Sequence, residues 1–170
     1  HLISFFKAYK FPVVFTRAAN VYGAGQQLYR IIPRTILSIR TGKPLLLHGG
    51  GTSRRSFIHI SDVVEATLKL TFNADSGSCW HISTKNALSI KDLVQKICDI
   101  LDYPFERIVE NVDERLGKDQ NYLLDSNHIR TKHNWSDNIS LEEGIKDTIN
   151  WIDNNLRYLK NLPWEYIHKK

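Results

Sequence analysis

The chain has 170 residues, 42% of them hydrophobic and 24% charged, and it carries a formal net charge of +5. This composition is typical of a globular protein with a sizeable core, and it excludes a disordered or low-complexity chain. No apolar run approaches the roughly 20 residues of a membrane-spanning helix, so we expect no membrane partner. The basic residues are scattered along the chain, which favours a small anionic partner over nucleic acid.

The first segments predict a helix, a buried strand and a loop. Residues 1–10 have the pattern of a helix end without a capping residue, and the apolar run 11–16 predicts a buried parallel strand. The loop at 18–25 contains two glycines, and ligands of open α/β sheets bind beyond the carboxyl ends of strands. No other segment has the pattern of a central parallel strand, so we expect the partner strands of 11–16 to lie elsewhere.

The remaining segments predict alternating helices and short strands. Ser61 is expected to cap a helix, and Ser89 and Ser140 each begin a capping box. The expected elements are helices over 29–40, 62–72, 89–101 and from 140 onward, and strands over 45–48, 55–60, 79–82 and 108–110. This succession predicts an α/β fold.

The two cysteines, Cys79 and Cys98, have no CxxC partner and no histidine at zinc-binding spacing. We expect them to be free thiols of a cytoplasmic protein, and we expect no metal site. The first residues also lack the basic leader and cleavage site of a signal peptide.

Three segments carry candidate chemistry. In the segment 17–23, two alanines precede Asn20, an amide that can both donate and accept hydrogen bonds. In the segment 49–57, three glycines precede Arg54 and Arg55, a combination suited to phosphate. The segment 114–119 carries two cations around a glycine. Each segment could instead be an ordinary turn or a solvated surface.

Taken in order, these segments resemble the extended short-chain dehydrogenase/reductases, the NAD-dependent epimerase/dehydratase family. The family's Arg-x-x-Asn-x-Tyr-Gly, Ile-Pro, Gly-x-Gly and Arg-x-Phe-x-x-x-x-Asp patterns match the following residues: Arg17, Asn20, Tyr22, Gly23, Ile32, Pro33, Gly49, Gly51, Arg55, Phe57 and Asp62. The later part resembles the dTDP-glucose 4,6-dehydratase branch of the family, although Leu116 replaces a proline and Lys118 a histidine.

This resemblance implies an α/β fold made of the last strand or strands of a Rossmann domain and a small mixed α/β substrate-binding domain. Residues 1–25 would end the NAD-binding domain. Residues 26–170 would mostly form the nucleotide-sugar-binding domain, with about 54–75 returning to the Rossmann side.

The resemblance also implies roles for individual residues. The cofactor NAD would lie against Ala18, Ala19 and Asn20. The nucleotide diphosphate sugar would be bound by Asn20 at the sugar, by Arg30 and Ile31 near the phosphate, by Leu46 and His48 at the base, and by Arg55 and Arg115 at the diphosphate. Two further substrate contacts are expected at His81, where dehydratases have asparagine, and at Lys118.

The catalytic Tyr-x-x-x-Lys pair of the family precedes a segment like 1–3, so we expect it upstream and assign no catalytic residue to this chain. None of Tyr22, Tyr29 or Tyr122 has a lysine four residues later. The parent enzyme would be a homodimeric, NAD-dependent nucleotide-sugar 4,6-dehydratase, a lyase that makes a 4-keto-6-deoxy sugar. A 4-epimerase of the same family and a non-catalytic nucleotide-binding fragment are the alternatives.

Overall fold

A computed structural model of the chain describes residues 1–114, 117 and 119–165. Its helices are α1 (Leu2–Tyr9), α2 (Ile31–Thr41), α3 (Ile60–Asn73), α4 (Ile90–Ile100), α5 (Phe105–Ile108), α6 (Asn127–His133) and α7 (Leu141–Leu159), and a short 3-10 turn lies at Gly49–Gly51. Its strands are β1 (Phe15–Ala18), β2 (Asn20–Tyr22), β3 (Leu45–His48), β4 (Arg54–Arg55), β5 (Phe57–His59), β6 (Cys79–Ile82), β7 (Leu88–Ser89), β8 (Val109–Val112) and β9 (Asn121–Tyr122).

The strands form small sheets that are mostly parallel. β1 pairs with β6, β2 with β5 and β3 with β8, all in parallel, while β4 lies between antiparallel β7 and parallel β9. The prediction that the first strand has no partner in this chain was therefore wrong. After α3 the chain returns as β6 alongside β1, a crossover that alternation within one segment does not reveal. The predicted loop at 18–25 likewise contains strand β2.

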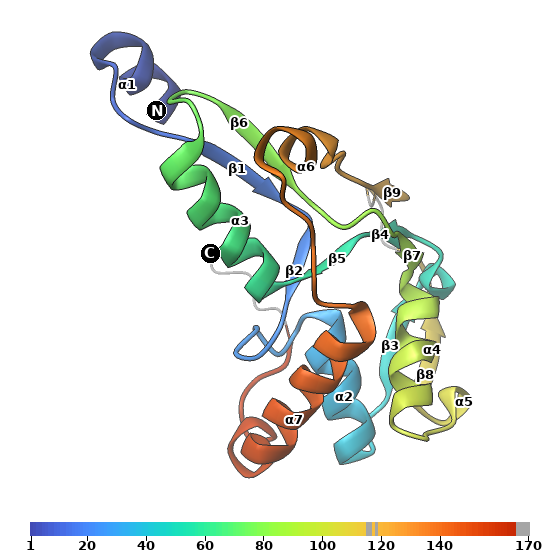
Figure 1. Cartoon of the computed structure of the whole chain (residues 1–170). Helices are drawn as coiled ribbons and strands as arrows, with labels where there is room; N and C mark the ends of the chain where they lie inside the picture. The colour runs from blue at the N-terminus through green and yellow to red at the C-terminus, as the bar shows by residue number, and fades with distance from the viewer. Residues whose placement is uncertain (115–116, 118, 166–170) are drawn as a thin grey trace.

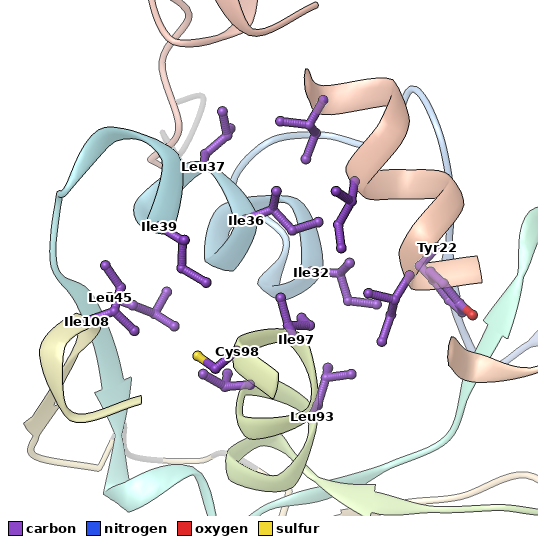
Figure 2. Close-up of a cluster of buried hydrophobic side chains, with 14 of the residues drawn as sticks. Tyr22, Ile32, Ile36, Leu37, Ile39, Leu45, Leu93, Ile97, Cys98 and Ile108 are labelled. Atoms are coloured by element: carbon purple, nitrogen blue, oxygen red, sulfur yellow. The ribbon is translucent and has the colours of Figure 1, made fainter. Parts of the chain in front are cut away.

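The larger hydrophobic core lies among α2, α4 and α7. Figure 2 shows Ile32 and Ile36 of α2 facing Leu93 and Ile97 of α4, with Tyr22 beside α7. All four aliphatic side chains are almost fully buried. Their spacing of four residues puts each pair on one face of its helix, which is why these two helices pack together.

A second core lies at the other end of the molecule, among β1, β6, α3 and α6 (Figure 1). Trp80 and Ile82 of β6 are buried there with Ala66 and Leu70 of α3. His81 lies between Trp80 and Ile82 on the strand and is half-buried. Alternation along the strand therefore turns it away from the neighbours that enter this core.

The paired strands β2 and β5 contribute to both cores. Tyr22 and Phe57 belong to the first core, whereas Ile58 belongs to the second and Val21 packs against it. Val21 lies opposite Ile58 in the register of the pair. Because side chains alternate between the faces of a strand, one face of this pair serves each core.

The caps of the helices agree with the sequence at two positions and differ at one. Ser89 and Ser140 form complete capping boxes with Asp92 and Glu143, as predicted. Ser61 is not the cap, because α3 begins one residue before it, at Ile60. The cap is His59, whose Nδ1 accepts a hydrogen bond from the backbone N–H of Ser61 at 3.4 Å. The imidazole thus takes the place that the sequence rules give to serine.

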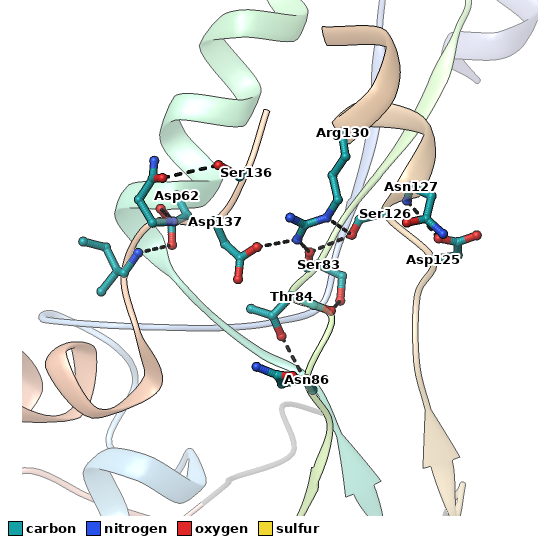
Figure 3. A network of polar contacts seen from close by, with 12 residues as sticks. Asp62, Ser83, Thr84, Asn86, Asp125, Ser126, Asn127, Arg130, Ser136 and Asp137 are labelled. Atoms are coloured by element: carbon teal, nitrogen blue, oxygen red, sulfur yellow. Dashed lines mark hydrogen bonds and ion pairs between the residues drawn. The ribbon is translucent and has the colours of Figure 1, made fainter. Parts of the chain in front are cut away.

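Polar contacts fix the chain between α6 and α7 (Figure 3). The buried carboxylate of Asp62 accepts hydrogen bonds from the backbone N–H of Asn138 at 2.9 Å and of Ile139 at 3.2 Å. Arg130 donates to the carbonyl of Ser83 at 2.9 Å and pairs with Asp137. These contacts anchor the segment that leads into α7 and hence the position of α7 on the first core.

In the part of the chain that the structure describes, no helix is both long and apolar enough to cross a membrane.

Candidate functional site

A cavity of about 1240 Å³ lies where the two cores meet, between β2, α2 and β3. It is lined by Ala18, Ala19, Asn20, Val21, Tyr22, Gln26, Gln27, Tyr29, Arg30, Ile31, Ile32, Arg34, Leu45, Leu46, Leu47, His48, Ser53, Arg55, Phe57, Ile90, Tyr122 and Glu165. The wall thus combines aliphatic side chains, three arginines and several amide or hydroxyl groups. Such a lining suits an anionic ligand that also has a flat or apolar part.

Eight of the site residues predicted from the sequence line this one cavity, and they are Ala18, Ala19, Asn20, Arg30, Ile31, Leu46, His48 and Arg55. They come from four separate segments of the chain. His81 is not among the lining residues. Arg115 and Lys118 lie outside the described residues.

The end of the cavity at β2 is organised by Asn20. Both its backbone N–H and its side-chain Nδ2 donate to the carbonyl of Ser56, each at 3.1 Å. These two bonds set the orientation of the amide at the carboxyl end of β1, beside the small residues Ala18 and Ala19. A flat ligand can approach the backbone at this point because neither alanine carries more than a methyl group.

Tyr22 follows on the same strand, and it is a structural group. Its ring is 2% exposed, and its hydroxyl donates to the carbonyl of Leu141 at 3.4 Å. Burial, together with the carboxylates of Asp62 and Asp147, raises the pKa of Tyr22 well above that of a free phenol. The hydroxyl therefore stays protonated at neutral pH, which excludes Tyr22 as a base.

Arg55 holds neighbouring backbone and also faces the cavity. Its Nη1 donates to the carbonyls of Arg54 at 2.7 Å and Gln120 at 3.3 Å, and its Nη2 donates to that of Asp119 at 2.6 Å. A guanidinium has five N–H donors, so these bonds leave two for a ligand. Arg55 thereby positions the residues before β9 next to the group that it would bind.

The neighbouring Arg54 also donates to a backbone carbonyl, but it does not face the cavity. It is exposed, its Nη2 donates to the carbonyl of Ala87 at 2.9 Å, and it does not line the cavity. Alternation along β4 separates the two arginines, which the sequence alone presents as an equivalent pair.

Strand β3 forms the wall opposite β2. Leu45 and Leu47 are buried in the first core, whereas Leu46 is 39% exposed and His48 is half-buried. Nδ1 of His48 lies 3.0 Å from the carbonyl oxygen of Asp113. Because a carbonyl only accepts, Nδ1 donates this bond, and Nε2 takes no part in it. Leu46 and His48 together offer an aliphatic surface and a flat ring.

Some lining residues were missed by sequence reasoning. Gln26 donates from Nε2 to the carbonyl of Val21 at 2.6 Å, and Tyr122 and Glu165 reach the cavity from distant parts of the chain. Tyr122 follows a charged loop, which is a weak signal. Glu165 gives no signal at all, because only the turn after α7 brings it back to the cavity.

The sequence also contains one Tyr-x-x-x-Lys spacing near its end, at Tyr166 and Lys170. Both residues lie outside the described residues. The spacing follows the family's other patterns in this chain, whereas the catalytic pair of the family precedes them, so we assign it no role. Among the described residues, no group of three or more His, Cys, Asp or Glu side chains could hold a metal ion.

Comparison with known proteins agrees with this geometry. The family model "NAD dependent epimerase/dehydratase family" matches residues 1–82, which include β1, β2, the glycine turn, both arginines of β4 and Asp62. Individual relatives extend the match over more than nine tenths of the chain. The chain belongs to the NAD-dependent epimerase/dehydratase family.

Two curated members of the family illustrate the similarity. The dTDP-D-glucose 4,6-dehydratase of Mus musculus is 32% identical over 163 residues, which cover 93% of this chain and 46% of the mouse protein. A trifunctional UDP-glucose 4,6-dehydratase, 3,5-epimerase and reductase of Arabidopsis thaliana is 33% identical over 154 residues, which cover 91% of this chain and 23% of that protein.

Solved structures of the family confirm the fold. A dTDP-glucose 4,6-dehydratase of Streptomyces venezuelae, solved with NAD, has a TM-score of 0.87 at 25% identity over 92% of this chain and 48% of its own. A UDP-glucose 4-epimerase of Thermotoga maritima, solved with UDP-glucose, has a TM-score of 0.83 at 26% identity. The match covers 91% of this chain and 50% of the epimerase. The predicted α/β fold is thus confirmed, and the chain spans about half the length of the dTDP-glucose 4,6-dehydratases that it matches and about a quarter of the trifunctional enzyme.

Proposed function

We propose that this chain forms the substrate-binding portion of an NAD-dependent nucleotide-sugar 4,6-dehydratase. The observation that carries the proposal is the single cavity that collects eight of the site residues predicted from four separate segments. The similarity to dehydratases acting on dTDP-glucose and UDP-glucose supports it. The reaction would yield a 4-keto-6-deoxy sugar.

The two hydrophobic cores support a division into two domains. We propose that the second core, with β1, β6, α3 and α6, belongs to the NAD-binding side, and that the first core, with α2, α4 and α7, belongs to the nucleotide-sugar side. This division keeps most of residues 1–25 and about 54–75 on the NAD side, with Tyr22 and Phe57 packing into the other core, and it adds β6 and α6. The cavity lies between the two sides, as expected for a site that brings a cofactor to a sugar.

We propose that NAD lies against Ala18, Ala19 and Asn20. These residues fit the edge of a flat ring, since they follow the carboxyl end of parallel strand β1, and two hydrogen bonds to Ser56 fix the amide of Asn20. NAD, when bound, supplies the oxidising power of the reaction by accepting a hydride from the sugar. We place the catalytic groups, including the Tyr-x-x-x-Lys pair, outside this chain and expect no turnover from these 170 residues alone.

The nucleotide diphosphate sugar would extend from Asn20 toward β3. The cations Arg30 and Arg55, with Ile31 between phosphate and sugar, suit a diphosphate, and Leu46 and His48 suit a nucleobase. Arg115 and Lys118 would add charge beside the diphosphate, and His81 stays a proposed contact that the described cavity does not include.

A 4-epimerase of the same family is the second candidate. The Thermotoga maritima UDP-glucose 4-epimerase matches this chain almost as well as the dehydratase structures do. The two activities differ in whether the sugar loses water, so mass spectrometry of the product formed by the parent enzyme separates them. Loss of 18 Da indicates the dehydratase, and an unchanged mass the epimerase.

We further propose that the parent protein is a cytoplasmic homodimer that does not bind nucleic acid. Exposed apolar residues of α1, namely Leu2, Ile3 and Phe5, support an interface at this helix, and both cysteines are free thiols. Analytical ultracentrifugation of the parent protein tests the dimer.

The binding proposal is tested by calorimetric titration of the chain with dTDP, UDP, GDP and CDP. Arg55→Ala should weaken binding about ten- to hundredfold, since hydrogen bonds to charged groups contribute about 1.5–3 kcal/mol. Arg115→Ala should also weaken binding. Arg54→Ala is the matched control, because it removes the same charge one residue away without touching the cavity. Equal affinities of the Arg54 and Arg55 variants would contradict the assignment of the cavity as the nucleotide site.

A further inference from the structure

The segment that follows α7 supplies part of the cavity wall. After α7 the chain turns back (Figure 1), and Leu162 and Trp164 pack, half-buried, against the first core. The ammonium of Lys43 lies 4.8 Å from the centre of the Trp164 ring, close enough for a cation–π contact. These contacts anchor Trp164, and the next residue, Glu165, lines the cavity.

Glu165 differs in charge from the rest of the wall. It is the only carboxylate among the described lining residues, whereas Arg30, Arg34 and Arg55 are cations. A carboxylate repels a diphosphate, so it does not help to hold that part of the ligand. It can only accept hydrogen bonds, and it therefore matches a hydroxyl or N–H donor of the ligand.

The anchor of this segment indicates which part of the ligand Glu165 meets. Lys43 lies between α2 and β3, two residues before β3 begins. Trp164 thus holds Glu165 on the side of the cavity where β3 begins, next to Leu45 and Leu46, whereas Asn20 lies on the β2 side. If the ligand lies as proposed, with its base at β3 and its sugar at Asn20, Glu165 faces the nucleoside.

We propose that the carboxylate of Glu165 accepts a hydrogen bond from the ribose 2′-hydroxyl and makes the site selective for ribonucleotide sugars. This inference rests on the proposed function. An acidic side chain that accepts from a ribose hydroxyl is the device by which many nucleotide sites recognise ribose. The relatives do not decide between the two nucleotides, since enzymes acting on dTDP-glucose and UDP-glucose are 32% and 33% identical to this chain. Glu165 assigns the chain to the UDP-type substrates.

The test compares ligands that differ only in the 2′-hydroxyl. UDP and 2′-deoxy-UDP are titrated into the whole chain by calorimetry, and 5-methyl-UDP and dTDP form a second pair with the other base. We expect each ribonucleotide to bind about ten- to hundredfold more tightly than its deoxy partner, the range given by one hydrogen bond to a charged group. Glu165→Ala should abolish this ratio and leave the affinity for the deoxynucleotides unchanged or higher, because it also removes a like charge.

Glu106→Gln is the matched control, since it removes an exposed carboxylate of α5 that is not among the lining residues. Its ratio should equal that of the unaltered chain. A ratio near one in the unaltered chain, or a ratio that survives Glu165→Ala, overturns the role of Glu165 and leaves the nucleotide site intact. Absence of binding for all four nucleotides instead contradicts the proposed function, and the role of Glu165 with it.

Discussion

The contact between Tyr22 and Gly144 fixes how closely β2 approaches α7, and Gly144→Ala tests it. A Cβ built on Gly144 would lie 2.8 Å from Cζ and 2.9 Å from Cε2 of the Tyr22 ring, and closer still to its hydroxyl. The ring is 2% exposed and cannot swing into solvent. The substitution therefore forces either the ring or α7 to move.

Two opposing effects set the size of the change. Replacing glycine by alanine inside a helix stabilises it by about 1 kcal/mol. Forcing an extra methyl group into a packed core costs about 1–3 kcal/mol, and contact with three atoms of a fixed ring favours the upper part of this range. We expect a net loss of about 1–2 kcal/mol in the free energy of unfolding. For a chain of this size the melting temperature should fall by roughly 2–8 °C.

Urea denaturation followed by circular dichroism measures this loss. Asn150→Ala, at an exposed position of the same helix, is the control and should raise stability by a few tenths of a kcal/mol through helix propensity alone. Adding Tyr22→Phe to Gly144→Ala removes the closest contact and should recover part of the loss. A Gly144→Ala variant as stable as the unaltered chain would refute the close approach of β2 and α7.

Three further predictions concern buried polar groups. Asp62→Ala should lower the free energy of unfolding by about 2–3 kcal/mol in urea denaturation, because two backbone N–H groups lose a charged acceptor. Arg130→Met should lower the free energy of unfolding clearly more than Arg40→Met does, since the side chain of Arg130 is 13% exposed and that of Arg40 is 30% exposed. At the more exposed site an ion pair contributes only about 0–1 kcal/mol. Equal losses of stability in the two variants would contradict this. Burial raises the pKa of Cys98 to about 11, so at pH 8 iodoacetamide should alkylate exposed Cys79 and leave Cys98 protonated and unreacted. The unfolded thiol ionises near pH 9, so this proton contributes stability that is lost as the pH rises through the range from 9 to 11.

Local sequence patterns were sufficient for the elements that depend on local chemistry. The capping boxes at Ser89 and Ser140 and the strands 45–48 and 79–82 are predicted and observed at the same residues. Each rests on contacts within a few residues or on a short apolar run. The predicted site residues that line the cavity were proposed from the order of the family's motifs, since no single segment distinguished a ligand site from a turn.

The errors arise where distant segments decide the outcome. Asn20 begins a strand only because β5 lies beside it, although the glycines after it indicate a loop. His59 displaces Ser61 as a cap because β5 ends with the imidazole already over the first turn of α3. Arg55 and Arg54 become different only when the residues before β9 supply carbonyls to one of them. The partners of Asn20 and Arg55 lie outside any short window of the sequence, whereas His59 is a local partner of Ser61 that the usual capping residues do not include.

The pair formed by β2 and β5 has one further consequence for ligand binding. Phe57 and Ile58 are adjacent in the chain, yet each is buried in a different core. A rotation of one core against the other would have to withdraw one of these side chains from its packing. The wall of the cavity is therefore preorganised, and little of the affinity for a ligand is lost to rearrangement of the protein. Substitutions that weaken the packing of Phe57 or Ile58 should weaken ligand binding, although Ile58 does not line the cavity. They would do so because the shape of the cavity would then vary from molecule to molecule.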